Sequence, residues 1–303
     1  MSRPDIHDVT PVPVRRYGQQ FGAVVLIVFA LLFAQNLATN QNIQWPVVAQ
    51  YMFAPSILSG LGMTILLTVL AMVIGLSIGV VLAIMRLSDS RVFQGAAWAW
   101  IWFFRGVPPL VQLIFWYNLA LLYPDLSIGI PFGPKLFIWD TNAVITPFSA
   151  AILGLAFTEA AYAAEMIRAG IQAVSGGQVE ASATLGMSRS QTLRRIVLPQ
   201  ALRIVIPPIG NDTISMLKFT SLVSVLALPD LLFSAQMVYA RTYQTIPLLM
   251  VATIWYLVLT TVLTFAEHAI EHRLSEGSPP SKRSFQKRLF DMRPFRRQKE
   301  FSA

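Results

Sequence analysis

Long apolar runs without a charged residue constrain this chain more than any other feature. The longest extends from Ile57 to Met85, a stretch of 29 residues with no Lys, Arg, Asp or Glu. As an α-helix it would be ~43 Å long at ~1.5 Å per residue, enough to cross a ~30 Å hydrocarbon core with some tilt. Only 13% of the chain is charged, whereas soluble domains carry about 25%. Because lipid tails do not require a polar surface, the sequence indicates a polytopic membrane protein.

The apolar runs predict an all-α integral membrane bundle with about six transmembrane helices. Arg105 to Pro109 interrupt the third run, where the prolines predict a kink or a break. Leu222–Ala235 is too short to span the bilayer and contains Pro229-Asp230, which favours a re-entrant or broken segment packed against protein. The six predicted spans are Gly22–Ala38, Ile57–Met85, Trp98–Tyr123, Thr146–Ile167, Ala201–Ser221 and Ile246–Ala269.

The distribution of Lys and Arg predicts that both chain ends face the cytoplasm. With six spans and an inner N-terminus, the outer segments are roughly 40–56, 124–145 and 222–245. They contain Lys135 and Arg241 out of 23 basic residues. The reversed topology would place nearly every cation outside, against the positive-inside rule.

Composition also excludes several classes of function. The chain has no cysteine, and its three histidines are scattered without a metal-ligand spacing, so we expect no metal site. No pairing of a nucleophile with a base suggests a membrane enzyme. The net charge of +8 lies in inner segments and in the tail 275–303. We therefore expect no nucleic-acid partner but a disordered tail that is either solvated or associated with anionic lipid headgroups.

The inner loop 169–203 has the pattern of folded helices and not of a linker. Ser175 with Gln178 and Ser188 with Gln191 have the spacing of capping boxes. Gly186 between them suits the left-handed end of a first short helix, and Pro199 marks the start of the next span. We therefore predict two short helices joined at an angle, which would form a docking surface on the cytoplasmic side.

Within this loop, Glu180-Ala181-Ser182 is followed by three residues, Gly186, nine residues and then Ile196-Val197-Leu198-Pro199. This spacing resembles the EAA loop of permeases from binding-protein-dependent ABC importers, whose pattern is Glu-Ala-Ala, three residues, Gly, nine residues and Ile-x-Leu-Pro. The chain departs from it at Ser182, which replaces the second alanine. The small residues would let the loop sit in a cleft of another protein, where Glu180 would meet a basic group.

The resemblance extends over about residues 57–274 and points to the polar amino-acid branch of these permeases, which includes histidine, glutamine and arginine permeases. One departure is Phe219, because the branch commonly has Asp after the Lys, and this weakens any ion-pairing role there. The further similar segments are Arg105-Gly106-Val107-Pro108, Ala161-Tyr162-Ala163-Ala164-Glu165-Met166-Ile167-Arg168, Leu198-Pro199-Gln200-Ala201-Leu202-Arg203 and Lys218-x-Thr220-Ser221-Leu222.

The resemblance implies the pore-forming subunit of an ATP-driven importer for polar amino acids in the bacterial cytoplasmic (inner) membrane. Its expected partners are cytoplasmic ATP-binding subunits, a second permease subunit that is identical or homologous, and an extracytoplasmic solute-binding protein. The chain has no Gly-x-x-x-x-Gly-Lys-Ser/Thr loop. We therefore expect it to bind no cofactor of its own and the partner subunit to use ATP and Mg. Residues expected to contact that subunit are Glu180, Ala181, Ser182, Gly186, Ile196, Leu198 and Pro199.

Ionisable and polar side chains inside the spans are the candidates for the substrate pathway, because burying them in a membrane is expensive. Glu159 and Tyr162 are three residues apart, so we expect them to share a helix face that receives an ammonium or guanidinium group. Arg105, Lys218 and Asn211 with its neighbour Asp212 are further candidates. For each, the alternative is an interhelical hydrogen bond or salt bridge that holds the bundle together. Glu165 and Arg168 are expected to form a local pair.

Four regions follow from these patterns. We expect a cytoplasmic tail at 1–20, an extra transmembrane helix and outer loop at 21–56, a permease domain of the type I importer class at 57–274, and a basic cytoplasmic tail at 275–303. The alternative function is a secondary amino-acid transporter driven by an ion gradient, although its usual internal repeat is missing. Amide, acidic, sulfur-containing and opine substrates all stay open.

Overall fold

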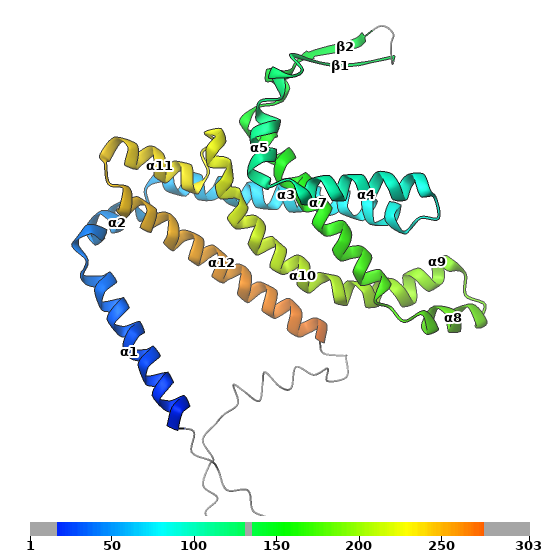
Figure 1. The fold of residues 1–303 in the computed structure, drawn as a ribbon, viewed down its shortest axis with the longest axis horizontal. Helices are drawn as coiled ribbons and strands as arrows, with labels where there is room; N and C mark the ends of the chain where they lie inside the picture. The colour runs from blue at the N-terminus through cyan, green and yellow to red at the C-terminus, as the bar shows by residue number, and fades with distance from the viewer. Residues whose placement is uncertain (1–16, 131–134, 276–303) are drawn as a thin grey trace, which may run out of the picture.

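The computed structural model describes residues 17–130 and 135–275 and consists almost entirely of helices (Figure 1). In chain order, the elements are α1 (Tyr17–Thr39), η2 (Gln41–Ile43), α2 (Trp45–Met52), α3 (Pro55–Leu87), α4 (Arg91–Gly106), α5 (Pro109–Tyr117), η3 (Leu119–Leu121), β1 (Asp125–Gly129), β2 (Lys135–Asp140), α6 (Thr141–Val144), α7 (Pro147–Gln172), α8 (Gly176–Thr184), α9 (Arg189–Thr192), η4 (Leu193–Val197), α10 (Leu198–Phe219), η5 (Thr220–Leu226), α11 (Leu231–Thr242) and α12 (Thr245–Ser275).

In the described part of the chain, four helices are long and apolar enough to cross a membrane, namely α1, α3, α7 and α12. A fifth span is formed if the bent pair Arg189–Leu226 and Leu231–Thr242, with 44° between its halves, counts as one. The bend lies at Pro229-Asp230, as the sequence predicts. The prediction of six spans is therefore only approximately right, and the difference lies at Trp98–Tyr123.

That predicted span is two short helices in the structure. Helix α4 has 16 residues and ends at Gly106, and α5 begins at Pro109 and has 9 residues. The break follows from Pro108 and Pro109, which have no backbone N–H to continue the helix. The side chain of Gln112 is 3% exposed and forms hydrogen bonds with backbone groups left open at the break. Its Nε2 donates to the carbonyl oxygens of Phe104 at 3.0 Å and Val107 at 2.9 Å, and its Oε1 accepts from Thr158 on α7 at 3.1 Å.

Helices α3 and α7 form the centre of the bundle and approach each other closely at glycines. A Cβ atom at Gly75 would lie 2.5 Å from Glu159 Cβ, and one at Gly79 would lie 2.7 Å from Ala163 Cβ. Around this contact, the largest apolar core combines residues from α3, α5, α7 and the α10–η5 region, including Leu67, Leu113 and Leu155. Residues far apart in the sequence therefore meet in one core.

The hairpin β1–β2 projects from the top of the molecule, and the elbow formed by α8 and α9 lies at the right-hand edge, below α4 (Figure 1). The elbow lies in the lower half of the view, together with the start of α1 and the end of α12. Helices α2 and α11 lie in the upper half, on the same side as the hairpin.

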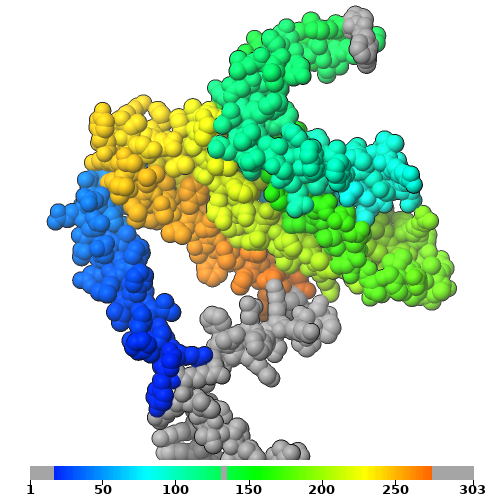
Figure 2. Space-filling model, viewed as in Figure 1, coloured from blue at the N-terminus to red at the C-terminus, as the bar shows by residue number. Residues whose placement is uncertain are grey.

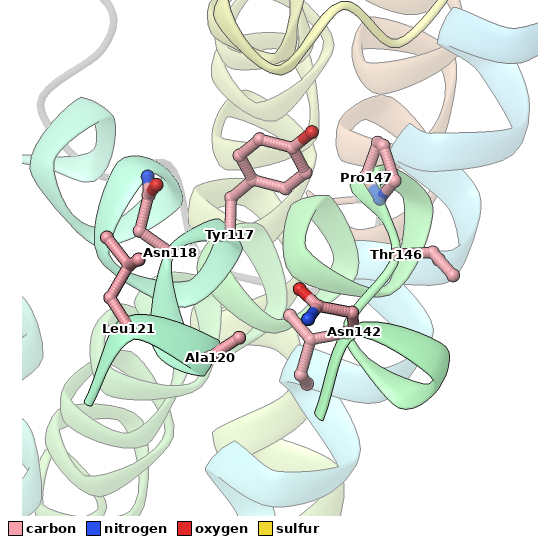
Figure 3. Close-up of a pocket in the computed structure, with 8 residues that line it drawn as sticks. Tyr117, Asn118, Ala120, Leu121, Asn142, Thr146 and Pro147 are labelled. Atoms are coloured by element: carbon pink, nitrogen blue, oxygen red, sulfur yellow. The ribbon is translucent and has the colours of Figure 1, made fainter. Parts of the chain in front are cut away.

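The hairpin was not anticipated from the sequence, which predicts only an outer segment at 124–145. Its antiparallel register pairs Leu126 with Trp139 and Ile128 with Phe137, so these four side chains share one face. A cavity of about 460 Å³ lies where the hairpin joins the bundle. In Figure 3, Tyr117 and Asn118 from α5–η3 lie on one side of this cavity, and Asn142 and Thr146 from α6–α7 lie on the other.

Helix α1 stands apart from the rest of the molecule. None of its residues is buried, and Figure 2 shows it extending away from the bundle. Its apolar side chains are distributed around the whole helix. Phe21, Leu26 and Phe29, for example, are all exposed and point in different directions. Such a helix suits a position surrounded by lipid. The predicted tail 275–303 and residues 1–16 of the predicted tail 1–20 lie outside the described residues, apart from Ser275 at the end of α12.

Candidate functional site

The predicted elbow in the inner loop is formed by α8 and α9, which meet at Gly186. Gly186 has a φ of +73°, in the left-handed region that glycine adopts most easily. Its N–H donates to Ala183 O at 3.0 Å, and Met187 N–H donates to Ser182 O at 3.1 Å. These bonds end α8 sharply, so the chain turns directly into α9.

One of the two predicted capping boxes is present and the other is not. At Ser188, the hydroxyl accepts from Gln191 N–H and the Gln191 side chain accepts from Ser188 N–H, as the spacing predicts. Helix α8 begins after Ser175, but the Ser175 side chain forms no capping bond, so that prediction was wrong in detail. Gly176 and Gly177 in the first turn leave the backbone N–H groups there open to water, which can satisfy them instead.

Pro199 lies in the first turn of α10, so it marks entry into the next span as the sequence predicts. The chain is helical without a gap from Arg189 to Phe219, with a π-helix at Leu193–Val197 and Pro199 in the first turn of α10. A π-turn widens the backbone directly before the proline, whose missing N–H and ring disturb an ordinary α-turn. Helix α9 therefore continues into α10 as one rod.

The elbow presents most of its predicted contact residues to its surroundings (Figure 2). Glu180, Ala181, Gly186, Leu198 and Pro199 are exposed, and Ile196 is half-buried. Ser182 differs from them, since it is 2% exposed and points into the angle between α8 and α9. There its hydroxyl lies 2.8 Å from that of Thr192.

Glu159 on α7 is the most buried acidic side chain among the candidates, at 1% exposure. It packs against Gly75 of α3 and faces Asp212 of α10. Glu159 Oε1 and Asp212 Oδ2 are both buried, and neither has a hydrogen-bond partner in the described part of the chain. Two carboxyl groups therefore converge inside the bundle, and neither forms a salt bridge with another described residue.

Glu159 and Tyr162 are three residues apart on α7 and differ greatly in exposure. Tyr162 is 38% exposed, and the guanidinium of Arg105 lies over its ring, 5.2 Å from the ring centre. The partner of Glu159 is Asp212, which the sequence placed only in the same general region.

The remaining candidates lie elsewhere on the bundle. Asn211 and Lys218 are exposed on α10, and neither side chain forms an ion pair within residues 17–130 and 135–275. The local pair of Glu165 and Arg168 is confirmed, with 2.6 Å between Oε2 and Nη2. Arg86 of α3 approaches the same carboxylate at 4.0 Å. This cluster links α3 and α7 near the end that carries the elbow.

Known proteins resemble this chain over most of its length. The family described as binding-protein-dependent transport system inner membrane component matches residues 75–276. The arginine transport system permease protein ArgU of Corynebacterium glutamicum is 40% identical over 268 residues, covering 88% of this chain and 83% of that protein. The L-cystine transport system permease protein TcyB of Bacillus subtilis is 35% identical, covering 80% and 97%.

A solved structure agrees with the sequence relatives. The crystal structure of an amino acid ABC transporter with histidines contains a chain that is 34% identical to this one. It superposes with a TM-score of 0.64 and covers 74% of this chain and 97% of that one. The fold, the elbow with its EAA spacing and the relatives agree: the chain belongs to the family of inner membrane components of binding-protein-dependent transport systems, as a multi-pass permease subunit of an ABC importer whose ATPase is a separate subunit.

Proposed function

We propose that the chain forms half of the translocation pore of an importer for polar amino acids, driven by ATP hydrolysis in separate subunits. The observation that carries this proposal is the elbow. It is rigid and exposed at one end of the bundle, and it has the spacing of the EAA loop. The relatives named for arginine and cystine transport support the class of substrate.

In this arrangement two cytoplasmic ATP-binding subunits, which use ATP and Mg, dock on the elbows of two permease subunits. The second permease is a copy of this chain or a homologue. The binding protein delivers substrate at the opposite end, near α11 and the hairpin. Both termini then lie in the cytoplasm, which is supported by the start of α1 and the end of α12 lying in the same half of the molecule as the elbow (Figure 1).

The elbow joins the two helices that carry the buried carboxylates. Helix α8 follows α7 directly, and α9 continues into α10. When the ATP-binding subunits close, a push on the elbow reaches both α7 and α10 through rigid helices. We infer that the bundle responds by rocking between outward and inward access, a change between two discrete arrangements.

We further propose that Glu159, together with Asp212, favours substrates with a cationic side chain. Two carboxyl groups this close do not both ionise. The negative charge that the pair keeps attracts an ammonium or guanidinium group, because the surroundings screen it little. Glu159→Gln should lower uptake of arginine relative to uptake of glutamine by about tenfold, which corresponds to ~1.4 kcal/mol. Glu267→Gln, which changes a half-buried carboxyl on α12, is the matched control and should leave the ratio unchanged. Equal uptake of every amino acid by Glu159→Gln and the parent would contradict the proposal.

The first experiment is purification of the tagged chain from its own membranes in mild detergent. We expect an ATP-binding subunit to be recovered with it and to be lost when Glu180 is replaced by Lys. The variant should still insert into the membrane, because Glu180 is exposed and has no role in the core. Recovery of the chain alone, with uptake that collapses when the proton or sodium gradient is removed, would instead establish a secondary transporter.

A further inference from the structure

The residue at which the elbow departs from the EAA pattern has a specific structural role. Ser182 replaces an alanine of the pattern and is buried in the angle between α8 and α9, where Thr192 is 7% exposed. The two hydroxyl oxygens are 2.8 Å apart. An alanine at position 182 would have no atom to reach Thr192.

The direction of this hydrogen bond follows from the other contact of Ser182. A serine hydroxyl has one proton to donate, and that of Ser182 is donated to Val179 O at 2.6 Å. Ser182 Oγ therefore accepts, and Thr192 donates. The backbone carbonyl of Ser182 also accepts from Met187 N–H at 3.1 Å. One residue thus fixes both the end of α8 and its angle to α9.

We propose that the hydrogen bond between Ser182 and Thr192 couples α8 to α10 and thereby sets how much substrate is moved for each ATP hydrolysed. This inference rests on the proposed function of the elbow. Helix α8 is continuous with α7 through the chain, whereas α9, η4 and α10 form one helical rod. Two side-chain hydrogen bonds join α8 to this rod: the buried one between Ser182 and Thr192, and an exposed one in which Gln200 Nε2 donates to Gln178 Oε1 at 2.5 Å. Without the Ser182–Thr192 bond, the exposed Gln178–Gln200 bond is the side-chain hydrogen bond that still joins α8 to α10, and water competes for it. Movement of α8 is then passed to α7 but only partly to α10.

The test uses the complete importer, with its ATP-binding subunits and binding protein, reconstituted in liposomes. Substrate uptake and ATP hydrolysis are measured together, and their ratio is the readout. Ser182→Ala and Thr192→Val should each lower the ratio about fivefold, the effect of one buried hydrogen bond. The double variant should be no worse than the more damaging single variant, because both changes remove the same bond.

Two controls separate coupling from a general loss of structure. Thr184→Ala removes a hydroxyl from the same helix that is exposed and bonds only to Ala181 O, and it should keep the parent ratio. The exchange Ser182→Thr with Thr192→Ser preserves both hydroxyls and the total volume, and it should restore coupling. In every variant the amount of ATP-binding subunit recovered with the permease should equal that of the parent.

The outcomes distinguish this inference from the proposed function. A parent complex whose uptake does not depend on ATP overturns both. A parent complex that couples normally, with an unchanged ratio in Ser182→Ala, overturns only the role of the hydrogen bond. Single-variant effects that multiply in the double variant also overturn it, as does failure of the hydroxyl exchange to restore the ratio.

Discussion

At the residue scale, glycines on α3 set the distance between α3 and α7. At Gly75, the absence of a side chain leaves room for Glu159, whose Cβ and Cγ would lie 2.5 Å from an added Cβ atom. Because real Cβ contacts are longer than this, any larger residue must push α7 away or move Glu159 from its place opposite Asp212. The position of the buried carboxyl groups therefore depends on Gly75, which has no side chain of its own to interact with them.

Gly75→Ala should lower the stability of the bundle by about 1–3 kcal/mol through overpacking and should reduce uptake. Gly62→Ala on the same helix is the matched control, because a Cβ there meets nothing within 4 Å, and it should be neutral or slightly stabilising through its better helix propensity. Thermal unfolding in detergent measures the first effect. Equal unfolding temperatures for the two variants would show that the close approach of α3 and α7 is not needed.

At the scale of single elements, the break between α4 and α5 depends on one buried side chain. The prolines alone would leave carbonyl oxygens at the end of α4 without hydrogen-bond donors. The side-chain N–H groups of Gln112 donate to two of these oxygens. The oxygen of the same amide accepts a hydrogen bond from Thr158, one residue before Glu159, and so joins the break to α7. The break between α4 and α5 is therefore held in place by hydrogen bonds, close to the carboxyl pair of Glu159 and Asp212.

Gln112→Leu should destabilise the protein by about 2 kcal/mol, because it leaves buried acceptors unsatisfied while preserving most of the side-chain volume. Gln94→Leu is the control. Gln94 also donates to a backbone carbonyl, that of Ser88 at 2.6 Å, but it is only partly buried, so water can replace its bond and the expected change is below about 0.5 kcal/mol. Unfolding in increasing denaturant compares the two variants, and similar midpoints would contradict the role assigned to Gln112.

The elbow depends in the same way on the backbone conformation of Gly186. Gly186→Val should reduce uptake severely, because a branched residue at a φ of +73° is strained by ~1–2 kcal/mol or more. Gly186→Asn has a similar volume but tolerates the left-handed region, and it should keep much of the activity. A Cβ at Gly186 meets nothing within 4 Å in this chain, so the difference between Val and Asn reports the backbone. Equal loss in both variants would place the effect in the docking contact instead.

At the scale of the whole molecule, the helices differ greatly in how much they contribute to the common core. Helix α12 buries Leu248, Val251 and Ala252 against α11 and neighbouring elements. Helix α1 buries none of its own residues. Its link to the bundle includes the bond from Trp45 Nε1 to Leu37 O at 3.2 Å. We therefore regard α1 as an anchor outside the pathway.

Deletion of residues 2–36 should leave uptake per inserted molecule within about twofold of the parent. The orientation of the remaining spans should persist, because Arg86, Arg91 and the cations of the elbow stay on the same side of the bundle. Deletion of α12, in contrast, should prevent stable folding. Uptake into vesicles, normalised to the amount of inserted protein, measures the effect, and a complete loss without α1 would give this helix a role in the pore.

Local patterns were enough to predict much of this protein. The break at Pro108-Pro109, the bend at Pro229-Asp230, the left-handed Gly186 and the capping box at Ser188 all follow from neighbours a few residues apart. The inner loop could be predicted as an elbow for the same reason. Pro199 in the first turn of α10 was predicted in the same way. The capping box predicted at Ser175 is absent, because water can satisfy the first N–H groups of α8 instead.

The amino-acid sequence alone was enough to predict that the chain lies in a membrane and where its elbow is, because hydrophobicity and helix capping act between near neighbours. Three features came from the packing of the folded chain: Glu159 faces Asp212, Ser182 bonds to Thr192, and residues 125–129 pair with 135–140. These contacts depend on which helices and strands meet after folding. The burial and the partners of a side chain are properties of that packing, and they cannot be read from one segment alone.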